Sequence, residues 1–427
     1  MDPATGTDEV MDVLIDAGRI GRVGRSLPAG DAETIDATGC IVAPGLVDLH
    51  THLREPGRED EETIASASAS AAVGGYTAIC AMPNTDPVHD TASVVEKVWA
   101  LGREAGVVQV VPSGAITRGL RGEEMADLGE MARCRAQVRL FTDDGKGVQD
   151  ALVARRAMEY LVVFDAIYAE HCEVEALAAG GHMHEGDLSL RLGLRGIPAE
   201  AEELMAARDI ALARLTGCRL HLLHISTEGT VELVRRAKSE DVAVTAEATP
   251  HHFSLTDEAL VDYDPFAKVN PPLRPEAHRE AIVRGLADGT IDAIATDHAP
   301  HAEEEKDQEL TYAPPGLIGL ETALALTLTH LVEPGHLSMS DAIERSSTAP
   351  ARILGLEDQG GPISEGGPAN IVVFDPNTEW TVDPSVFASK ARNTPFAGHR
   401  LKGKVVHTFF DGRLTVTDGR LAQEEMV

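Results

Sequence analysis

Runs of apolar and β-branched residues recur between residue 45 and about residue 300, and each is followed by a longer segment whose apolar positions have helical spacing. This alternation is typical of repeated βα units around a parallel sheet. Strands are predicted over residues 45–53, 76–84, 108–116, 137–144, 166–172, 219–226, 242–250 and 292–300. Helices are predicted over residues 60–73, 92–104, 149–162, 199–216, 229–239 and 276–287. Eight such strands indicate an α/β fold, a (β/α)₈ TIM barrel.

The two ends of the chain have a different pattern. Residues 1–43 and 357–427 contain short alternating runs separated by turn residues, which favour hairpins. We expect these two segments to pair into one small β domain beside a catalytic barrel of residues 44–356. The acidic residues 59–62 are expected to open the first barrel helix, because carboxylates stabilise a helix N-terminus.

Composition limits the classes of function. The chain has 37 basic and 69 acidic residues, a net charge of −32, which argues against a nucleic-acid surface. Its five cysteines are scattered without a CxxC pair, as expected for reduced thiols in a cytosolic protein. We find no apolar signal segment and no apolar run of membrane-spanning length. A cytoplasmic location is therefore expected.

The first predicted strand ends in two histidines, His50 and His52. Residues two apart on a strand point to the same side, which is the lumen in a barrel strand. Two imidazoles satisfied by hydrogen bonds in a core are the alternative. The spacing favours a pair of metal ligands.

Other predicted strands also end in metal-binding side chains, and in a barrel these ends meet at one face. Four imidazoles with carboxylates are too many ligands for one tetrahedral zinc ion but suit two ions that share a carboxylate. The residues at these further strand ends are Asp143, Asp144, His171, His224 and Asp297.

These motifs resemble the amidohydrolase superfamily, and the surrounding sequence resembles the bacterial class I dihydroorotases over nearly the whole chain. The resemblance rests on PGLVDLHTHLREPG, GGYTAICAMPNT, LFTDDGKGVQ, AEHCE, LLHISTEGTVELVRRAK, VNPPLR, ATDHAPHAEEEK and NTPFAG. It implies two Zn²⁺ ions per subunit, bridged by a carboxylate and a hydroxide. One ion would be held by His50, His52 and Asp297, and the other by His171 and His224.

The bridging carboxylate is expected on the fourth strand. Many superfamily members use a carbamylated lysine there, but dihydroorotases with this motif use the second aspartate, here Asp144. Lys146 lies past the strand end and is a poor candidate. Asp143 is expected to support the site, although a single sequence leaves an exchange of roles between Asp143 and Asp144 open.

The substrate side is also assigned by the resemblance. Arg54, whose planar fork suits a carboxylate, would bind the substrate carboxylate with Asn84 and His301. Asn270 and the backbone at Pro315 and Gly316 would hold the ring. The alternatives are an ion pair of Arg54 with Glu55 or Glu59 and a turn-stabilising role for Asn84. Residues 303–316 are a candidate for the segment that closes over the ring.

The remaining histidines are interpreted as structural. His251 and His252 follow the seventh strand and are expected to support or pack against the site. His221 is expected to be structural, and His182 and His184 are expected in a solvated Gly-rich loop.

The expected reaction is the reversible conversion of N-carbamoyl-L-aspartate to L-dihydroorotate in pyrimidine synthesis, by a binuclear zinc hydroxide mechanism with Asp297 as the proton carrier. The alternatives are another cyclic amidase (a dihydropyrimidinase, hydantoinase or allantoinase) and a noncatalytic scaffold for aspartate transcarbamoylase. The expected partners are a second copy of the chain, in a homodimer, and aspartate transcarbamoylase.

Overall fold

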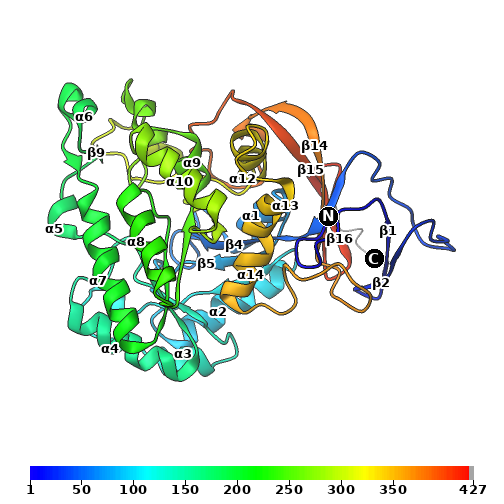
Figure 1. Ribbon diagram of the computed structural model, residues 1–427, viewed down its shortest axis with the longest axis horizontal. Helices are drawn as coiled ribbons and strands as arrows, with labels where there is room; N and C mark the ends of the chain where they lie inside the picture. Colours follow the sequence, from blue (N-terminus) through cyan, green and yellow to red (C-terminus); the bar gives the residue numbers. More distant parts are fainter. Residues whose placement is uncertain (423–427) are drawn as a thin grey trace.

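The computed structural model of the protein describes residues 1–422. Its centre is a set of eight parallel strands within these residues, each at one of the predicted positions. Figure 1 shows two of them, β4 and β5, in the interior with helices around them. They are β4 (Leu46–Thr51), β5 (Tyr76–Ala81), β6 (Gln109–Pro112), β7 (Leu140–Phe141), β8 (Ile167–Glu170), β11 (Arg219–Leu222), β12 (Val244–Ala248) and β13 (Ala293–Ile294). The prediction of these strands is confirmed.

Two ladders and two single bridges join these strands into a ring. One ladder has the order β4-β5-β6 and the other the order β13-β12-β11-β8-β7. A parallel bridge between Gly114 and Phe141 joins β6 to β7, and a parallel bridge between Thr51 and His298 joins β4 to the segment after β13. The eight strands therefore close into a barrel, and the first and last strands meet at the second bridge.

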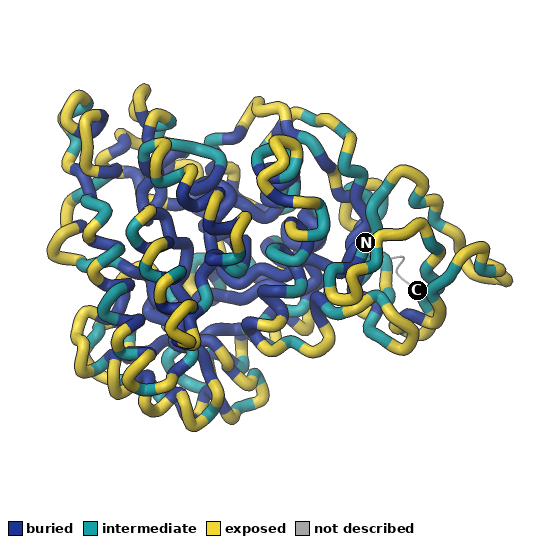
Figure 2. The backbone as a smooth tube through the Cα atoms, viewed as in Figure 1, coloured by how far each residue is buried: buried dark blue, intermediate teal, exposed yellow. Residues whose placement is uncertain are grey.

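Helices cover the outside of the strands, and their exposed residues face outward while the strands between them are buried (Figure 2). The helices of the described residues, including those in the loops, are α1 (Ile64–Val73), α2 (Ala92–Ala105), α3 (Leu128–Arg133), α4 (Ala151–Leu161), α5 (Glu175–Ala178), α6 (Asp187–Leu192), α7 (Glu200–Thr216), α8 (Glu228–Ser239), α9 (Pro250–Ser254), α10 (Glu276–Asp288), α11 (Glu303–Lys306), α12 (Ala323–Thr327), α13 (Met339–Ile343) and α14 (Ala349–Leu354). Short 3₁₀ turns are η1 (Arg118–Leu120), η2 (Val162–Phe164), η3 (Asp257–Leu260), η4 (Pro265–Ala267) and η7 (Pro384–Val386), and π turns are η5 (Leu328–Val332) and η6 (Glu344–Thr348). No helix of the described chain is both long and apolar enough to span a membrane.

The start of α1 differs from the prediction. The acidic residues 59–62 precede the helix, and Thr63 caps it by accepting a hydrogen bond from the Ser66 backbone. Glu62 is fully buried and accepts hydrogen bonds from Ser66 and Ser389. A side-chain cap thus replaces the expected acidic first turn, because tertiary contacts use Glu62 elsewhere.

A second, antiparallel sheet joins the two ends of the chain. Its order is β17-β16-β15-β14-β3, from β3 (Ile41–Pro44), β14 (Ile371–Thr381), β15 (Arg400–Phe410), β16 (Arg413–Thr417) and β17 (Arg420–Leu421). In register, Ile371 lies opposite Pro44. The hairpin β1 (Asp12–Asp16) and β2 (Arg19–Gly24) lies beyond this sheet, at the end of the molecule that carries the N-terminus (Figure 1). The domain boundaries after residues 43 and 356 stay a prediction.

A short parallel pair, β9 (Met183–His184) and β10 (Gly196–Ile197), lies in the excursion between β8 and β11. The largest apolar cluster packs the barrel strands against their helices, and a second cluster packs β4, β5 and α1 against β14 and β15. Continuous apolar burial thus connects the barrel to the antiparallel sheet and fixes the strand ends on which the candidate site lies.

Candidate metal centre

Two groups of buried side chains at the strand ends could each hold a metal ion, and they share Asp144. The first group is His50, His52 and Asp144, and the second is Asp144, His171 and His224. Asp297 joins the first group, since its Oδ1 lies 3.0 Å from His52 Nε2 and 3.5 Å from His50 Nε2. The structure thus brings together six of the residues that the sequence predicted as metal ligands.

The spacing of the donor atoms fits tetrahedral ions. Donors about 2.0–2.1 Å from one tetrahedral zinc ion lie about 3.3–3.4 Å from one another. Asp144 Oδ2 lies 3.4 Å from His50 Nε2 and 3.5 Å from His52 Nε2. Its Oδ1 lies 3.4 Å from His224 Nε2 and 3.7 Å from His171 Nδ1. Each oxygen of Asp144 therefore faces a different group, as a bridging ligand requires.

The charges of the site also favour a bound cation. Burial alone would raise the pKa of Asp144, but the imidazoles of His50, His171 and His224 hold it well below its ordinary value. Burial would lower the pKa of His50, but the carboxylates of Asp144 and Asp297 hold it well above its ordinary value. His50 Nε2 and Asp144 Oδ1 are buried without a hydrogen-bond partner among the described residues. The buried carboxylates of Asp144 and Asp297 thus attract positive charge to this place, and a metal ion could take the place of the proton on His50 and contact both unpartnered atoms.

The loop after β7 is shaped to aim Asp144 into the site. Asp143 accepts hydrogen bonds from the backbone of Ile116 and Thr117 and from the Thr117 hydroxyl, so its carboxylate points away from the histidines. Gly147 has a φ of +68°, and a Cβ there would lie 2.6 Å from the carbonyl oxygen of His171. The geometry favours Asp144 over Asp143 as the carboxylate between the two groups.

Comparison with known proteins agrees with this chemistry. A family model described as dihydro-orotase-like matches residues 39–230. A dihydroorotase from Streptomyces coelicolor is 50% identical over 97% of this chain and 96% of its own, and one from Mycobacterium tuberculosis is 48% identical over 97% of both chains. The chain belongs to the dihydroorotase family. The family predicted from the motifs is therefore confirmed.

Solved structures support the fold of this dihydroorotase-family chain. An L-hydantoinase (dihydropyrimidinase) from Arthrobacter aurescens has a TM-score of 0.85 at 26% identity, covering 97% of this chain and 94% of that one. A dihydropyrimidinase from Brevibacillus agri has a TM-score of 0.83 at 23% identity, covering 96% and 92%. The predicted barrel class is confirmed, and the chain is a cyclic amide hydrolase by its relatives.

Arg54 lies two residues after the HxH pair, and its side chain is buried rather than on the surface. Its Nε donates to the carbonyl of Pro300 at 3.0 Å and lies 3.0 Å from Glu61 Oε2. The expected alternative partners, Glu55 and Glu59, are not the ones it uses. Within residues 1–422, no hydrogen bond occupies the two Nη groups. The free edge of the guanidinium can therefore bind an anion.

The other predicted substrate residues lie around the two metal groups. Asn84 Oδ1 accepts from His52 Nδ1 at 2.9 Å, and Asn270 Nδ2 lies 3.4 Å from His171 Nε2. His301 Nε2 donates to the carbonyl of Pro315 at 2.9 Å, and a Cβ on Gly316 would lie 3.0 Å from that nitrogen. Burial and the charge of Arg54 lower the pKa of His301 to about 2, so its ring is neutral.

Sequence reasoning missed two buried carboxylates that orient the ligands. Glu247 accepts from His50 Nδ1 at 2.8 Å and from His221 Nε2 at 3.1 Å, which leaves Nε2 of His50 for the metal. Asp48 accepts from the backbone of His50 and from Thr296, the residue before Asp297. A carboxylate inside an apolar strand, as in VDLH and TAEA, was the available signal.

The backbone is strained at three of the predicted metal and substrate residues. Arg54, His224 and Asp297 have φ values of +63°, +32° and +48°. Such values are uncommon for residues other than glycine and concentrate at functional sites. The chain thus turns sharply just after β4, β11 and β13, at residues that belong to the candidate site.

The histidine interpretation needs one correction. His184 does not lie in a solvated loop: it is 8% exposed, and its Nδ1 accepts from Arg274 Nη1 at 3.1 Å. Within the GHMHEG segment, Met183 and His184 form β9. This strand is buried because Met183 packs in an apolar cluster and Arg274 contacts His184. His252 is bonded to Thr249 and to the carbonyl of Pro271, and His251 is buried beside it.

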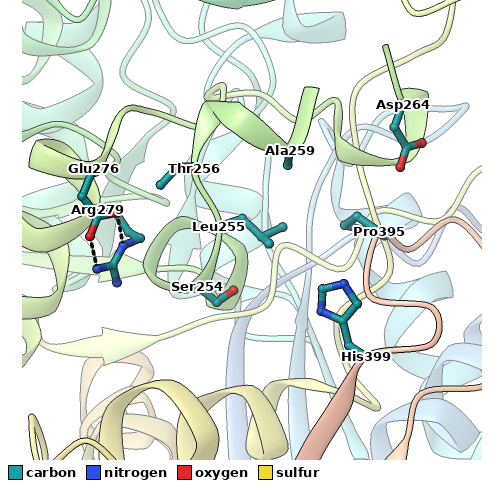
Figure 3. A pocket seen from close by; sticks show the side chains of 9 residues that line it. All are labelled: Ser254, Leu255, Thr256, Ala259, Asp264, Glu276, Arg279, Pro395 and His399. Carbon is teal, nitrogen blue, oxygen red and sulfur yellow. Dashed lines mark hydrogen bonds and ion pairs between the residues drawn. The ribbon is translucent and has the colours of Figure 1, made fainter. Parts of the chain in front are cut away.

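A hollow of about 440 Å³ lies near α9 and the start of α10, lined by Leu255, Asp264, Arg279 and His399 among others (Figure 3). Arg279 in its wall is paired with Glu276 at 2.7 Å. Its lining includes none of the predicted metal or substrate residues. It is not the candidate active site.

Proposed function

We propose that the protein is a dihydroorotase that interconverts N-carbamoyl-L-aspartate and L-dihydroorotate in pyrimidine synthesis. The observation that carries the proposal is the pair of three-ligand groups that share Asp144, next to a buried arginine whose Nη groups are free. The first supplies a centre for hydrolysis of an amide, and the second supplies a partner for a carboxylated ring. Neutral cyclic amides have no carboxylate that would need such a partner.

Two zinc ions are proposed as the cofactors. His50, His52 and Asp297 would hold one, His171 and His224 the other, and Asp144 would lie between them. When bound, a zinc pair supplies an activated water near neutral pH and polarises the carbonyl of the ring. The observed distances of 3.4, 3.5 and 3.4 Å from the Asp144 oxygens to the nitrogens of His50, His52 and His224 support this assignment, because ligands of one tetrahedral zinc ion lie about 3.3–3.4 Å apart.

Asp297 is proposed as the proton carrier. Its Oδ1 faces His50 and His52, which leaves the other carboxylate oxygen to take a proton from the attacking water. The same carboxylic acid then delivers this proton to the departing ring nitrogen, so that one residue serves as base and then as acid. In the ring-closing direction, Asp297 takes the proton from the ureido nitrogen.

The remaining side chains would bind and orient the ring. Arg54 would pair its Nη groups with the substrate carboxylate, with Asn84 and His301 beside it. Asn270 and the backbone of Pro315 and Gly316 would hold the ring amide groups. Ring opening creates a carboxyl group whose ordinary pKa is about 4, so a rise in pH favours the open product.

The setting of the enzyme belongs to the same proposal. A cytoplasmic location is proposed from the scattered cysteines and the lack of a predicted signal segment, and a homodimer and an association with aspartate transcarbamoylase are proposed as its partners. Size-exclusion chromatography with light scattering tests the homodimer, and a mixture with purified aspartate transcarbamoylase tests the association. A monomer and separate elution would contradict these two expectations.

Activity is tested by ring opening with the zinc-loaded protein at mildly alkaline pH, comparing L-dihydroorotate, dihydrouracil, hydantoin and allantoin. We expect turnover of dihydroorotate alone, and loss of this turnover in Asp297→Asn. Turnover of a neutral ring instead would contradict the role of Arg54. No turnover with two bound zinc ions would favour a noncatalytic scaffold.

A further inference from the structure

Two lysine side chains are buried under the segment formed by residues 307–316. Lys306 has no exposed surface and Lys268 is 7% exposed. Within residues 1–422, ion pairs to carboxylates are formed by Lys238 and Lys402 but not by Lys268 or Lys306. Burial lowers the pKa of both, that of Lys306 to about 7. Burying an amine without a carboxylate partner is unfavourable, so these lysines require a structural explanation.

Both amines bind backbone carbonyls of the same segment. Lys306 Nζ donates to the carbonyls of Pro314 at 2.9 Å and Gly316 at 3.0 Å. Lys268 Nζ donates to the carbonyls of Leu310 at 2.8 Å and Ala313 at 2.6 Å. Each amine carries at least two N–H bonds, charged or neutral, which is enough for two carbonyls. The segment forms neither helix nor strand, and within residues 1–422 the carbonyls of Leu310, Ala313 and Pro314 have no other donor.

The bonded segment ends at the candidate ring-binding wall. Gly316 N donates to the carbonyl of Lys268 at 2.9 Å, which ties the segment to the strand-like stretch that carries Asn270. The carbonyl of Gly316 also accepts from Asn393 Nδ2 at 3.1 Å. Gly316 has a φ of +133°, and its backbone lies against Ala299 and His301. Any shift of the segment would therefore move the groups that face the ring.

We propose that Lys268 and Lys306 are positioning residues that fix residues 310–316 as a rigid wall of the ring-binding pocket. They touch no substrate and act through the backbone of Pro315 and Gly316. The segment predicted to close over the ring is thus held in place before the substrate arrives. This inference rests on the proposed function, because that function assigns the ring contacts to Pro315 and Gly316.

The test uses the full-length, zinc-loaded protein and the variant Lys306→Met, which keeps the length of the side chain but removes its donors. We expect KM for L-dihydroorotate to rise about tenfold or more while kcat changes by less than about threefold, because the wall binds the ring but carries no proton. Hydrogen exchange of the backbone in residues 307–316 should become faster. Two zinc ions should remain bound.

Matched variants separate positioning from a general loss of structure. Lys404→Met removes an exposed lysine on β15 and should change neither KM nor hydrogen exchange. Lys306→Gln, which retains two N–H donors on a shorter side chain, should recover part of the KM. If Lys306→Met does not fold, Lys268→Met takes its place, with the same expected changes in KM and hydrogen exchange.

Two results would overturn the inference. One is an unchanged KM together with unchanged hydrogen exchange in residues 307–316. The other is a loss of kcat without a change in KM, which would place Lys306 in the chemical step. If the unmodified protein does not open dihydroorotate, the proposed function fails on its own. Hydrogen exchange of the substrate-free variants still tests whether the two lysines hold the segment.

Discussion

Arg54→Met gives the sharpest test of the anion pocket. The side chain is 5% exposed, and its two Nη groups are free to bind the substrate carboxylate. Hydrogen bonds that involve a charged group contribute about 1.5–3 kcal/mol each, so two of them give about 3–6 kcal/mol. Since about 1.4 kcal/mol corresponds to a factor of ten, kcat/KM for dihydroorotate should fall by about 10²–10⁴. The carboxamide of dihydroorotate, which carries no charge, should lose far less.

The same substitution removes one of the two arginines that pair with Glu61, so that only Arg58 remains. Burial raises the pKa of Glu61 to about 7, although Arg54 and Arg58 oppose this shift. Without Arg54, we expect the free energy of unfolding at pH 8 to fall by about 1–3 kcal/mol. The double variant Arg54→Met/Glu61→Gln should regain this stability but not the activity.

Two measurements check this reasoning. Steady-state kinetics with dihydroorotate and its carboxamide give the two kcat/KM ratios, and urea denaturation gives the change in stability. An equal loss for both substrates would show that Arg54 acts on something other than the carboxylate. Recovery of activity in the double variant would show that the first loss came from Glu61 alone. Zinc content serves as the control for an intact metal centre.

Three further predictions concern stability and metal binding. Burial raises the pKa of Glu321 to about 7, above its ordinary value of 4.5, so the folded state loses stability as pH rises between these values. Glu321→Gln keeps the accepting oxygen, and its free energy of unfolding, measured by urea denaturation, should rise by up to about 3 kcal/mol at pH 8 but little at pH 5. A gain that does not vary with pH would contradict this. Gly147→Ala should bind fewer than two zinc ions, because the new Cβ would clash with the carbonyl of His171. The control Gly39→Ala, which is also at positive φ but has open space around it, should bind both ions. Equal metal content in the two variants would refute the steric argument. Removal of metal by a chelator should lower Tm, since an ion at about 1,000 times its Kd stabilises the folded state by about 4 kcal/mol, and added Zn²⁺ should restore it; an unchanged Tm would mean that the site holds no metal.

The eight barrel strands could be predicted because each is a short apolar run with its own turn residues, so local pattern is sufficient. That the candidate ligands lie together could be predicted for a related reason, because a polar side chain at the end of such a run is conspicuous. The parts that failed depend on distant contacts. Glu62 belongs to Ser389 rather than to the first turn of α1, and His184 is buried by Arg274. Neither partner is near in sequence.

Residues that act through others were also beyond the sequence. Lys306 has no distinguishing pattern in the sequence, and its role comes from the backbone carbonyls that it contacts. Glu247 stands inside an apolar strand, but only the structure shows that it contacts His50 and His221. Family resemblance favours Asp144 over Asp143, whereas the structure gives a physical reason: the carboxylate of Asp143 already accepts a hydrogen bond from the Thr117 hydroxyl. The choice between the two neighbouring aspartates therefore depends on Ile116 and Thr117, which lie 27 and 26 residues earlier in the chain and contact Asp143 in the fold.

The bridge between Thr51 and His298 has a consequence for how the enzyme is made. It joins the first barrel strand to the last, and His52 and Asp297 stand on its two sides. During synthesis, 245 residues separate His52 from Asp297, so the first metal group gains its last ligand only when the last barrel strand has been made. A nascent or truncated chain that stops before Asp297 carries the histidines but not the complete site. Completion of the metal centre is thus coupled to closure of the barrel, because the contact between His52 and Asp297 and the bridge between Thr51 and His298 form at the same place.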